Sequence, residues 1–307
     1  MPACIIRRMP DASHMRDQLT IFFTRLARRV IEVREVVAVA GGSIQPTYRA
    51  TLADATVVFV KAGAPEHMGR LRAEARGLEA LGRVGALRVP EVLLLGGEGR
   101  HSFLVLEHLD LAPGTPADCA RMGRELAQLH RASAAQFGFE RDNFIGATPQ
   151  ANRLGDAWPA FFRDQRLLPQ LTMAAAGREA GPWIDGGLKV ADSLAGFFAG
   201  YQPKPSLLHG DLWAGNAGFL KDGTPVLYDP AVYFGDREAD VAMSELFGGF
   251  APEFRAAYDE AWPLDPGYGV RRDLYNLYHV LNHLNLFGAK YVPQAQGLIT
   301  RLLSEIR

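Results

Sequence analysis

The feature that most restricts the fold of this chain of 307 residues is a single change in hydrophobic pattern near residue 110. Before it, short runs rich in β-branched residues are separated by tight turns. After it, apolar residues recur mostly at helical spacing. The first pattern predicts strands and the second predicts helices. We therefore expect an α+β chain with a small antiparallel sheet followed by a larger, mainly helical part.

The expected elements divide the chain into two lobes. In the first part, helices are expected over 11–30 and 67–84, and strands over 36–40, 47–52, 56–61, 91–95 and 102–107. Pro113, Gly114 and Pro116 indicate a connector. We therefore predict an N-terminal lobe over 1–109 and a C-terminal lobe over 110–307. Later helices are expected over 117–135, 158–168, 183–201, 238–247, 252–262, 270–287 and 294–306, with one β-rich island over 206–228.

Composition excludes several classes of protein. The chain has 33 Lys and Arg against 34 Asp and Glu, a net charge of −1, so it lacks the basic character of a nucleic-acid-binding protein. Hydrophobic residues make up 48%, too many for a disordered chain. Only Cys4 and Cys119 are present, and no apolar run is long enough for a membrane span. We expect a cytoplasmic monomer with no nucleic-acid or membrane partner.

The β-rich island contains the residues with the clearest chemistry. An apolar strand leads into His209-Gly210-Asp211, and Asn216 follows five positions after Asp211. A hairpin turning at 221–223 then leads to Asp229. Phosphoryl transfer from ATP needs a carboxylate that orients the attacking hydroxyl and accepts its proton, and oxygen ligands for Mg²⁺. Asp211 fits the first task, while Asn216 and Asp229 fit the second.

Two further expectations concern this island. Because Pro230 follows Asp229, we expect Asp229 to be extended. We expect His209 to hold the catalytic loop by hydrogen bonds, since Asp211 already fills the role of the base. Each residue alone has an ordinary explanation as a cap or turn former. Their combined spacing favours a kinase-like site.

Residues that fit the nucleotide-binding part of a kinase lie earlier in the chain. Lys61 ends an apolar strand, as does the kinase lysine that binds the α- and β-phosphates of ATP. In the helix expected next, Glu74 lies three residues after Leu71 and four before Leu78, on the apolar face. A carboxylate on such a face needs a cationic partner. We predict that Glu74 pairs with Lys61.

Two other segments are placed where a kinase binds nucleotide. Gly41, Gly42 and Ser43 lie between the first two expected strands, where a loop would cover the phosphates, although a plain hairpin turn explains them about as well. Glu107 and Leu109 follow the last strand of the first lobe. They would offer main-chain groups to adenine, and a simple strand end is the alternative.

At this point the chain resembles the fructosamine kinase, or ketosamine-3-kinase, family. The resemblance is carried by His-Gly-Asp-Leu-Trp-Ala-Gly-Asn at 209–216, Tyr-Asp-Pro-Ala at 228–231 and the run from Phe234 to Phe250. Trp213 and Glu-Leu-Phe-Gly-Gly-Phe at 245–250 distinguish it from aminoglycoside and choline kinases. The resemblance implies a protein-kinase-like fold that uses ATP and Mg²⁺. It also implies phosphorylation of the 3-hydroxyl of ketoamines, the adducts of sugars with lysine amines, as a step in deglycation. Many eukaryotic members carry Cys where this chain has Ser43, so redox regulation at that position is not expected.

Substrate contacts are less closely defined. Trp213 could stack on a sugar or pack between loop and helix. Tyr275, Tyr278, Asn282 and Asn285 share a helix face that could line a sugar pocket or form a satisfied buried network. The nearest alternative function is a phosphotransferase of the same fold acting on an aminoglycoside, macrolide or choline-like alcohol. A nucleotide-binding pseudokinase is disfavoured because the five predicted nucleotide and catalytic residues are all present.

Overall fold

The computed structural model describes residues 12–39 and 45–306, which form two compact units. Unit 1 holds the residues up to Glu79 together with Pro90–Asp110, and unit 2 holds Ala80–Val89 and the chain from Leu111 onward. Residues 80–89 join unit 2 because the Leu227 N–H donates to the Arg88 carbonyl, 2.9 Å away.

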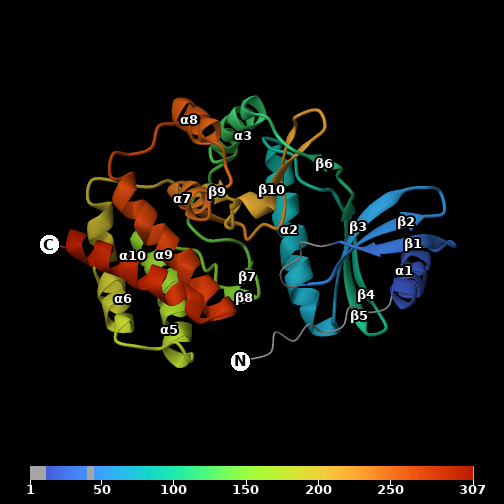
Figure 1. Ribbon diagram of the computed structural model, residues 1–307, viewed down its shortest axis with the longest axis horizontal. Helices are drawn as coiled ribbons and strands as arrows, with labels where there is room; N and C mark the ends of the chain where they lie inside the picture. The colour runs from blue at the N-terminus through green and yellow to red at the C-terminus, as the bar shows by residue number, and fades with distance from the viewer. Residues whose placement is uncertain (1–11, 40–44, 307) are drawn as a thin grey trace. The chain divides into compact units, whose positions relative to one another are not determined.

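Unit 1 is an antiparallel sheet with two helices (Figure 1). Its sheet order is β1-β2-β3-β5-β4. The helices are α1 (Ala12–Ala27) and the start of α2 (Met68–Val84), and the strands are β1 (Val33–Ala38), β2 (Thr47–Leu52), β3 (Val57–Gly63), β4 (Val92–Glu98) and β5 (His101–Glu107). All five predicted strands are present, but β4 runs beyond the predicted end at Leu95 because Glu98 still pairs with His101.

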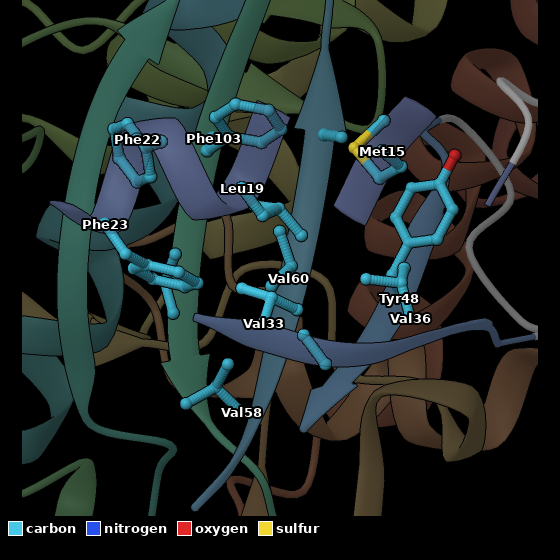
Figure 2. Packing of buried hydrophobic residues seen from close by; sticks show 13 residues of the cluster. Met15, Leu19, Phe22, Phe23, Val33, Val36, Tyr48, Val58, Val60 and Phe103 are labelled. Carbon is cyan, nitrogen blue, oxygen red and sulfur yellow. The ribbon is translucent and has the colours of Figure 1, made fainter. Parts of the chain in front are cut away.

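The core of unit 1 lies between α1 and one face of the sheet. Figure 2 shows Met15, Leu19 and Phe22 of α1 directed at the strands, with Phe22 and Phe103 in ring contact at 5.1 Å. Since side chains alternate along a strand, Val58, Val60 and Ala62 of β3 enter this core. Lys61 therefore lies on the opposite face of the sheet from α1.

Unit 2 is mainly helical, with short pairs of strands. Its helices are α3 (Pro116–Leu129), α4 (Trp158–Phe162), α5 (Leu168–Ala176), α6 (Trp183–Asp192), α7 (Glu238–Leu246), α8 (Pro252–Ala261), α9 (Tyr268–Phe287) and α10 (Val292–Glu305). The helix predicted over 183–201 ends at Asp192, and a short 3-10 helix follows over Leu194–Phe198. Among the described residues, no helix is both long and apolar enough to cross a bilayer.

Short strands hold the loops of unit 2. They are β6 (Leu111–Ala112), β7 (Asn143–Ile145), β8 (Thr148–Gln150), β9 (Ser206–Leu208), β10 (Ala217–Leu220), β11 (Pro225–Leu227) and β12 (Tyr233–Gly235). The predicted hairpin is β10 paired with β11, and β9 pairs with β12. The β7–β8 hairpin was not predicted, because three-residue strands carry almost no periodic signal.

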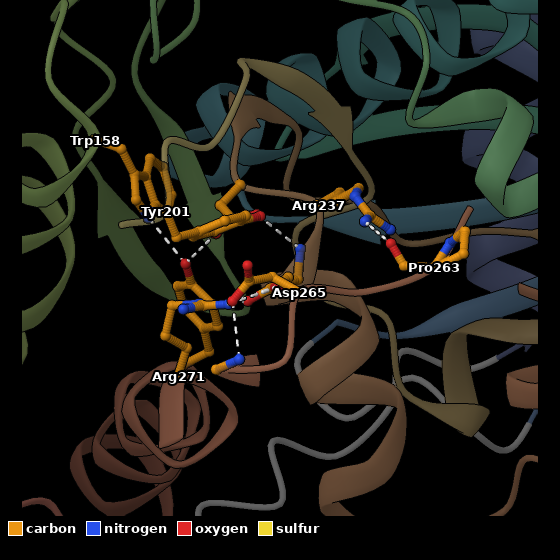
Figure 3. Close-up of polar contacts among 10 residues, drawn as sticks. Trp158, Tyr201, Arg237, Pro263, Asp265 and Arg271 are labelled. Atoms are coloured by element: carbon orange, nitrogen blue, oxygen red, sulfur yellow. Dashed lines mark hydrogen bonds and ion pairs between the residues drawn. The ribbon is translucent and has the colours of Figure 1, made fainter. Parts of the chain in front are cut away.

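A buried polar network fastens α7 to α9 (Figure 3). The hydroxyl of Tyr275 donates to Asp236 at 2.6 Å and accepts from the Trp158 indole at 2.9 Å. The Arg271 guanidinium binds both carboxylate oxygens of Glu238, at 2.7 and 3.1 Å. Buried polar groups are stable only when they are paired in this way, so the network holds the helices around the loops in one arrangement.

Candidate active site

The loop after β9 brings Asp211 and Asn216 together. The side-chain amide of Asn216 donates to the Asp211 carbonyl at 2.9 Å and to its carboxylate at 3.2 Å. These bonds commit the amide nitrogen of Asn216, so its oxygen is the atom that could bind a cation. Gly210 permits this loop: its φ is +82°, and a Cβ there would lie 2.1 Å from the Ala231 carbonyl oxygen.

His209 is fully buried and bonded to backbone on both ring nitrogens. Its Nε2 lies 3.0 Å from the Tyr228 carbonyl, and its Nδ1 lies 3.3 Å from the Asp211 N–H. An Nε2–H tautomer satisfies both contacts, donating to the carbonyl and accepting at Nδ1. Burial lowers the pKa of His209, which favours that neutral form. The ring thus ties the loop to the end of the hairpin, the contact that a structural role requires.

Asp240 of α7 is a residue that the sequence analysis missed. It is buried, and its carboxylate accepts from the backbone N–H of His209 at 2.7 Å, that of Gly210 at 2.9 Å and the His130 ring at 3.2 Å. Burial alone would raise the pKa of Asp240, but these hydrogen bonds and the nearby histidines lower it. Asp240 lies within the run from Phe234 to Phe250 that carries the family resemblance, but no role was assigned to it there.

Asp229 lies beside Asn216, as the hairpin predicted, but its backbone does not have the predicted conformation. The Tyr228 N–H donates to the Asn216 carbonyl at 3.0 Å, which closes the hairpin base. The φ of Asp229 is +57°, so the expected extended geometry is wrong. The left-handed conformation costs about 1–3 kcal/mol for a residue other than glycine. Tertiary bonds around the segment hold it there, including Ala231 N–H to the His209 carbonyl at 2.8 Å.

Two carboxylates therefore approach each other at this site. Burial, followed by the negative charge of Asp229, raises the pKa of Asp211 to about 7, against the lowering effect of the Asn216 amide. A raised pKa makes Asp211 a stronger proton acceptor than an ordinary carboxylate.

The donor set suits magnesium. Asn216 and Asp229 offer an amide and a carboxylate oxygen, the hard ligands that Mg²⁺ prefers. The mutual repulsion of Asp211 and Asp229 is the kind that a dication would relieve. Within the described residues there is no cluster of three or more His, Cys, Asp and Glu suited to a metal. Two protein ligands completed by phosphate oxygens and water are typical of Mg²⁺ with a nucleotide.

In unit 1 the predicted ion pair is present. The Lys61 ammonium lies 2.7 Å from a Glu74 carboxylate oxygen, and both side chains are largely buried. Lys61 reaches α2 from the central strand β3, where it lies opposite Thr47 and Leu104. The pair holds the ammonium in one position on the sheet face opposite α1.

The other predicted nucleotide contacts are less informative. Gly41, Gly42 and Ser43 lie outside the described residues. Glu107 is the last residue of β5, and its N–H donates to the Glu91 carbonyl at 2.9 Å, so the carbonyl is the main-chain group that it could offer to adenine. Leu109 lies in the half-buried segment that follows.

Trp213 is 38% exposed at the surface of the catalytic loop. Its ring meets Phe247 edge to face at 6.4 Å. A Cβ at Gly215 would lie 2.2 Å from the Trp213 ring, so glycine leaves room for that ring. Packing against Phe247 and stacking on a sugar are compatible, because part of the ring remains exposed.

The polar face of α9 is a satisfied network. Tyr278 donates to the Gln150 side chain at 2.7 Å, and Asn282 and Asn285 both bond the side chain of Gln170, at 3.2 and 2.7 Å. Gln150 in turn donates to the Ala231 carbonyl at 3.1 Å, next to the Asp229 segment. The sequence analysis missed both glutamines. A contact of α9 with substrate stays a prediction.

Comparison with known proteins gives a consistent result. A model of the fructosamine kinase family matches residues 15–305. A Synechocystis protein named a probable ketoamine kinase is 44% identical over 273 residues, 88% of this chain and 91% of its own. An Arabidopsis thaliana protein named chloroplastic protein-ribulosamine 3-kinase is 36% identical, over 91% of this chain and 86% of its own. A crystal structure provisionally named a fructosamine-3-kinase, from Thermobifida fusca, has a TM-score of 0.82 at 37% identity and covers 94% of this chain and 99% of its own.

Proposed function

Because this chain belongs to the fructosamine kinase family and is an ATP-dependent ketoamine kinase of the protein-kinase-like fold, we propose that Asp211 is its catalytic base. The observation that carries the proposal is the position of Asp211, bonded to Asn216 and held by the Asp240-anchored loop. Membership of this family of enzymes sets the pseudokinase alternative aside.

In this mechanism Asp211 orients the 3-hydroxyl of the ketoamine sugar and accepts its proton as the oxygen attacks the γ-phosphorus of ATP. The bond to ADP breaks as the new phosphate ester forms. Lys61, positioned by Glu74, binds the α- and β-phosphates. Glu107 and Leu109 contact adenine through the main chain. Most of the rate acceleration comes from positioning and charge stabilisation.

Asn216 and Asp229 would hold Mg²⁺. Bound there, Mg²⁺ would supply positive charge that stabilises the negative charge developing during phosphoryl transfer. The oxygen ligands at the base of the β10–β11 hairpin support this assignment.

We further propose that the substrate is a ribulosamine or fructosamine adduct whose sugar stacks on Trp213, with Tyr278, Asn282 and Asn285 behind it. The product decomposes and releases the amine, which makes the enzyme a deglycation kinase. The plant relative named for ribulosamine supports the ribulosamine choice. A monomer in the cytoplasm is our proposal for its state and location.

The test is ADP release measured with a panel of ribulosamine, fructosamine, aminoglycoside and choline substrates. We expect stimulation by ketoamines, with phosphate on O3 of the product by NMR. Stimulation only by aminoglycosides or choline would contradict the proposed substrate. Omission of Mg²⁺ should abolish turnover, and full activity in EDTA would contradict the metal assignment.

A further inference from the structure

A continuous strip of half-exposed rings extends from the catalytic loop along unit 2. The aromatic strip consists of Trp213, Phe247, His283, Phe287 and Tyr291. Phe247 meets Trp213 at 6.4 Å and His283 at 4.7 Å, and His283 meets Phe287 at 5.5 Å and Tyr291 at 5.3 Å between ring centroids.

The strip differs from the aromatic residues of the core. Trp213, Phe247 and Phe287 are 38%, 38% and 44% exposed, whereas rings such as Tyr258 and Tyr275 are fully buried. Single exposed apolar residues are ordinary, but contiguous ones mark interaction surfaces. Aromatic rings at such surfaces supply large contact areas at low entropic cost.

The far end of the strip is positively charged. The ammonium of Lys290 lies 5.0 Å from the ring centre of Tyr291 and 5.8 Å from that of Phe287. Burial and the charge of Lys290 lower the pKa of His283, so the imidazole in the strip is neutral near pH 7. A ligand that follows the strip therefore meets apolar rings first and a cation last.

The length of the strip exceeds what a sugar adduct of a single amino acid needs. The path from Trp213 through Phe247 and His283 to Phe287 consists of three distances between ring centroids. Laid end to end, they equal the length of at most about five residues of extended polypeptide. A sugar held at Asp211 occupies only the end that begins at Trp213. The remaining rings lie beyond that end, where they could contact whatever is attached to the amine.

We propose that the aromatic strip binds the polypeptide that flanks a glycated lysine, with apolar side chains on the rings and an acidic residue near Lys290. The inference rests on the proposed function, because the sugar must first occupy the site at Asp211. It commits to protein-bound ketoamines as the substrates that use this surface. Continuity with the catalytic loop and the charge at the far end support this occupant.

The experiment compares two substrates that share one sugar. These are Nε-ribulosyl-Nα-acetyl-lysine and a seven-residue peptide with a central ribulosyl-lysine. On each side of the lysine the peptide continues outward with Leu, Phe and then Glu, so that the acidic residue follows the apolar ones. The variants are Phe287→Ala, Tyr291→Ala and their combination. The control is Leu188→Ala, which removes an exposed aliphatic side chain of α6.

For the double variant we expect KM for the peptide to rise at least about tenfold, while kcat and the KM of the small adduct change less than about twofold. The control should change neither. An equal change for both substrates, or none for the peptide, would overturn the inference. A wild-type enzyme that phosphorylates only the small adduct would overturn it too, and would leave the proposed function intact. No phosphorylation of either substrate by the wild type would instead contradict the ribulosamine substrate of the proposed function.

Discussion

At the candidate site, the neighbours of a residue change its chemical properties, as they do for Asp211 beside Asn216 and Asp229. Asp211 is partly buried, and this burial together with the negative charge of Asp229 raises its pKa to about 7. Asn216 favours the ionised form by donating to it at 3.2 Å. These opposing effects keep a base that can still take up a proton near neutral pH.

Replacing Asp211 with Asn tests the role of that carboxylate. The amide retains the size of the side chain but cannot accept the hydroxyl proton, so we expect kcat to fall by about 10²- to 10⁴-fold. The affinity for Mg·ATP should stay within about threefold, since the variant keeps Asn216 and Asp229. Coupled ADP release and calorimetric titration measure the two quantities. Asp222→Asn, in the exposed hairpin turn, is the control, and near-normal turnover of Asp211→Asn would refute the base assignment.

Asp229 combines an unfavourable backbone conformation with a candidate metal ligand. Asn tolerates the left-handed region better than Asp and carries no charge, so Asp229→Asn should raise the free energy of unfolding by up to about 1 kcal/mol. The same change should weaken Mg²⁺-dependent nucleotide binding by at least about tenfold.

Chemical denaturation and titration with Mg·ADP test these two effects. Ala55→Gly is a matched control, because Ala55 also has a positive φ, of +67°. It should be stabilised without loss of nucleotide binding. Unchanged Mg·ADP affinity of Asp229→Asn would show that Asp229 is not a ligand.

At the scale of elements, α7 positions the loop that follows β9. Asp240 reaches the backbone of His209 and Gly210 from a helix thirty residues away in sequence. The same helix is fastened to α9 by the Arg271–Glu238 pair, whose side chains are almost fully buried. The position of the catalytic loop thus depends on how two helices pack.

We expect Asp240→Asn to act through that position. Asn has one carboxamide oxygen in place of the two carboxylate oxygens of Asp. At least one of the backbone N–H groups that Asp240 now accepts from would lose its partner, so the loop should shift. A displacement near 1 Å costs about a hundredfold in kcat, while KM for ATP should change less than about threefold. Steady-state kinetics gives this split, and thermal unfolding reports the accompanying loss of stability. The exposed Asp185→Asn of α6 is the control; an unchanged kcat in Asp240→Asn would exclude a positioning role.

For the molecule as a whole, stability in acid depends on groups buried in a fixed charge state. Burial, and then the neighbouring His283, lower the pKa of His279 to about 3, while Asp240 raises it and Arg166 lowers it. An unfolded histidine titrates near pH 6.5. Below that pH the unfolded chain binds the proton more readily, so His279 destabilises the fold progressively as the pH falls towards 3. Buried Asp236 and Glu238, whose pKa values are raised, act in the opposite direction.

Comparison with His279→Gln isolates the contribution of this histidine. As the pH falls from 6.5 towards 4, the free energy of unfolding of the wild type should decrease relative to that of the variant by up to about 1.4 kcal/mol per pH unit. Urea unfolding of both proteins across this range measures the difference. A difference that is independent of pH would show that His279 is not held neutral.

Local patterns were enough to predict much of the fold. The strand positions, the β10–β11 hairpin and the pairing of Lys61 with Glu74 each depend on spacing within one or two elements. The alternation of side chains along a strand and the faces of a helix follow directly from the spacing of residues in the sequence. The helix predicted to reach residue 201 ends at Asp192. Apolar residues continue beyond that point, but the backbone is no longer α-helical there.

By itself, the sequence determined the family and the kinase chemistry and predicted the residues that carry it, because these depend on short motifs within single segments of the chain. Only the tertiary structure decided that Asp229 adopts a left-handed backbone, that Asp240 anchors the loop and that Trp213 begins an aromatic strip. Each of these depends on segments separated by tens of residues. Their contacts arise when whole elements pack to bury apolar surface and pair polar groups, and no spacing along the chain specifies that packing.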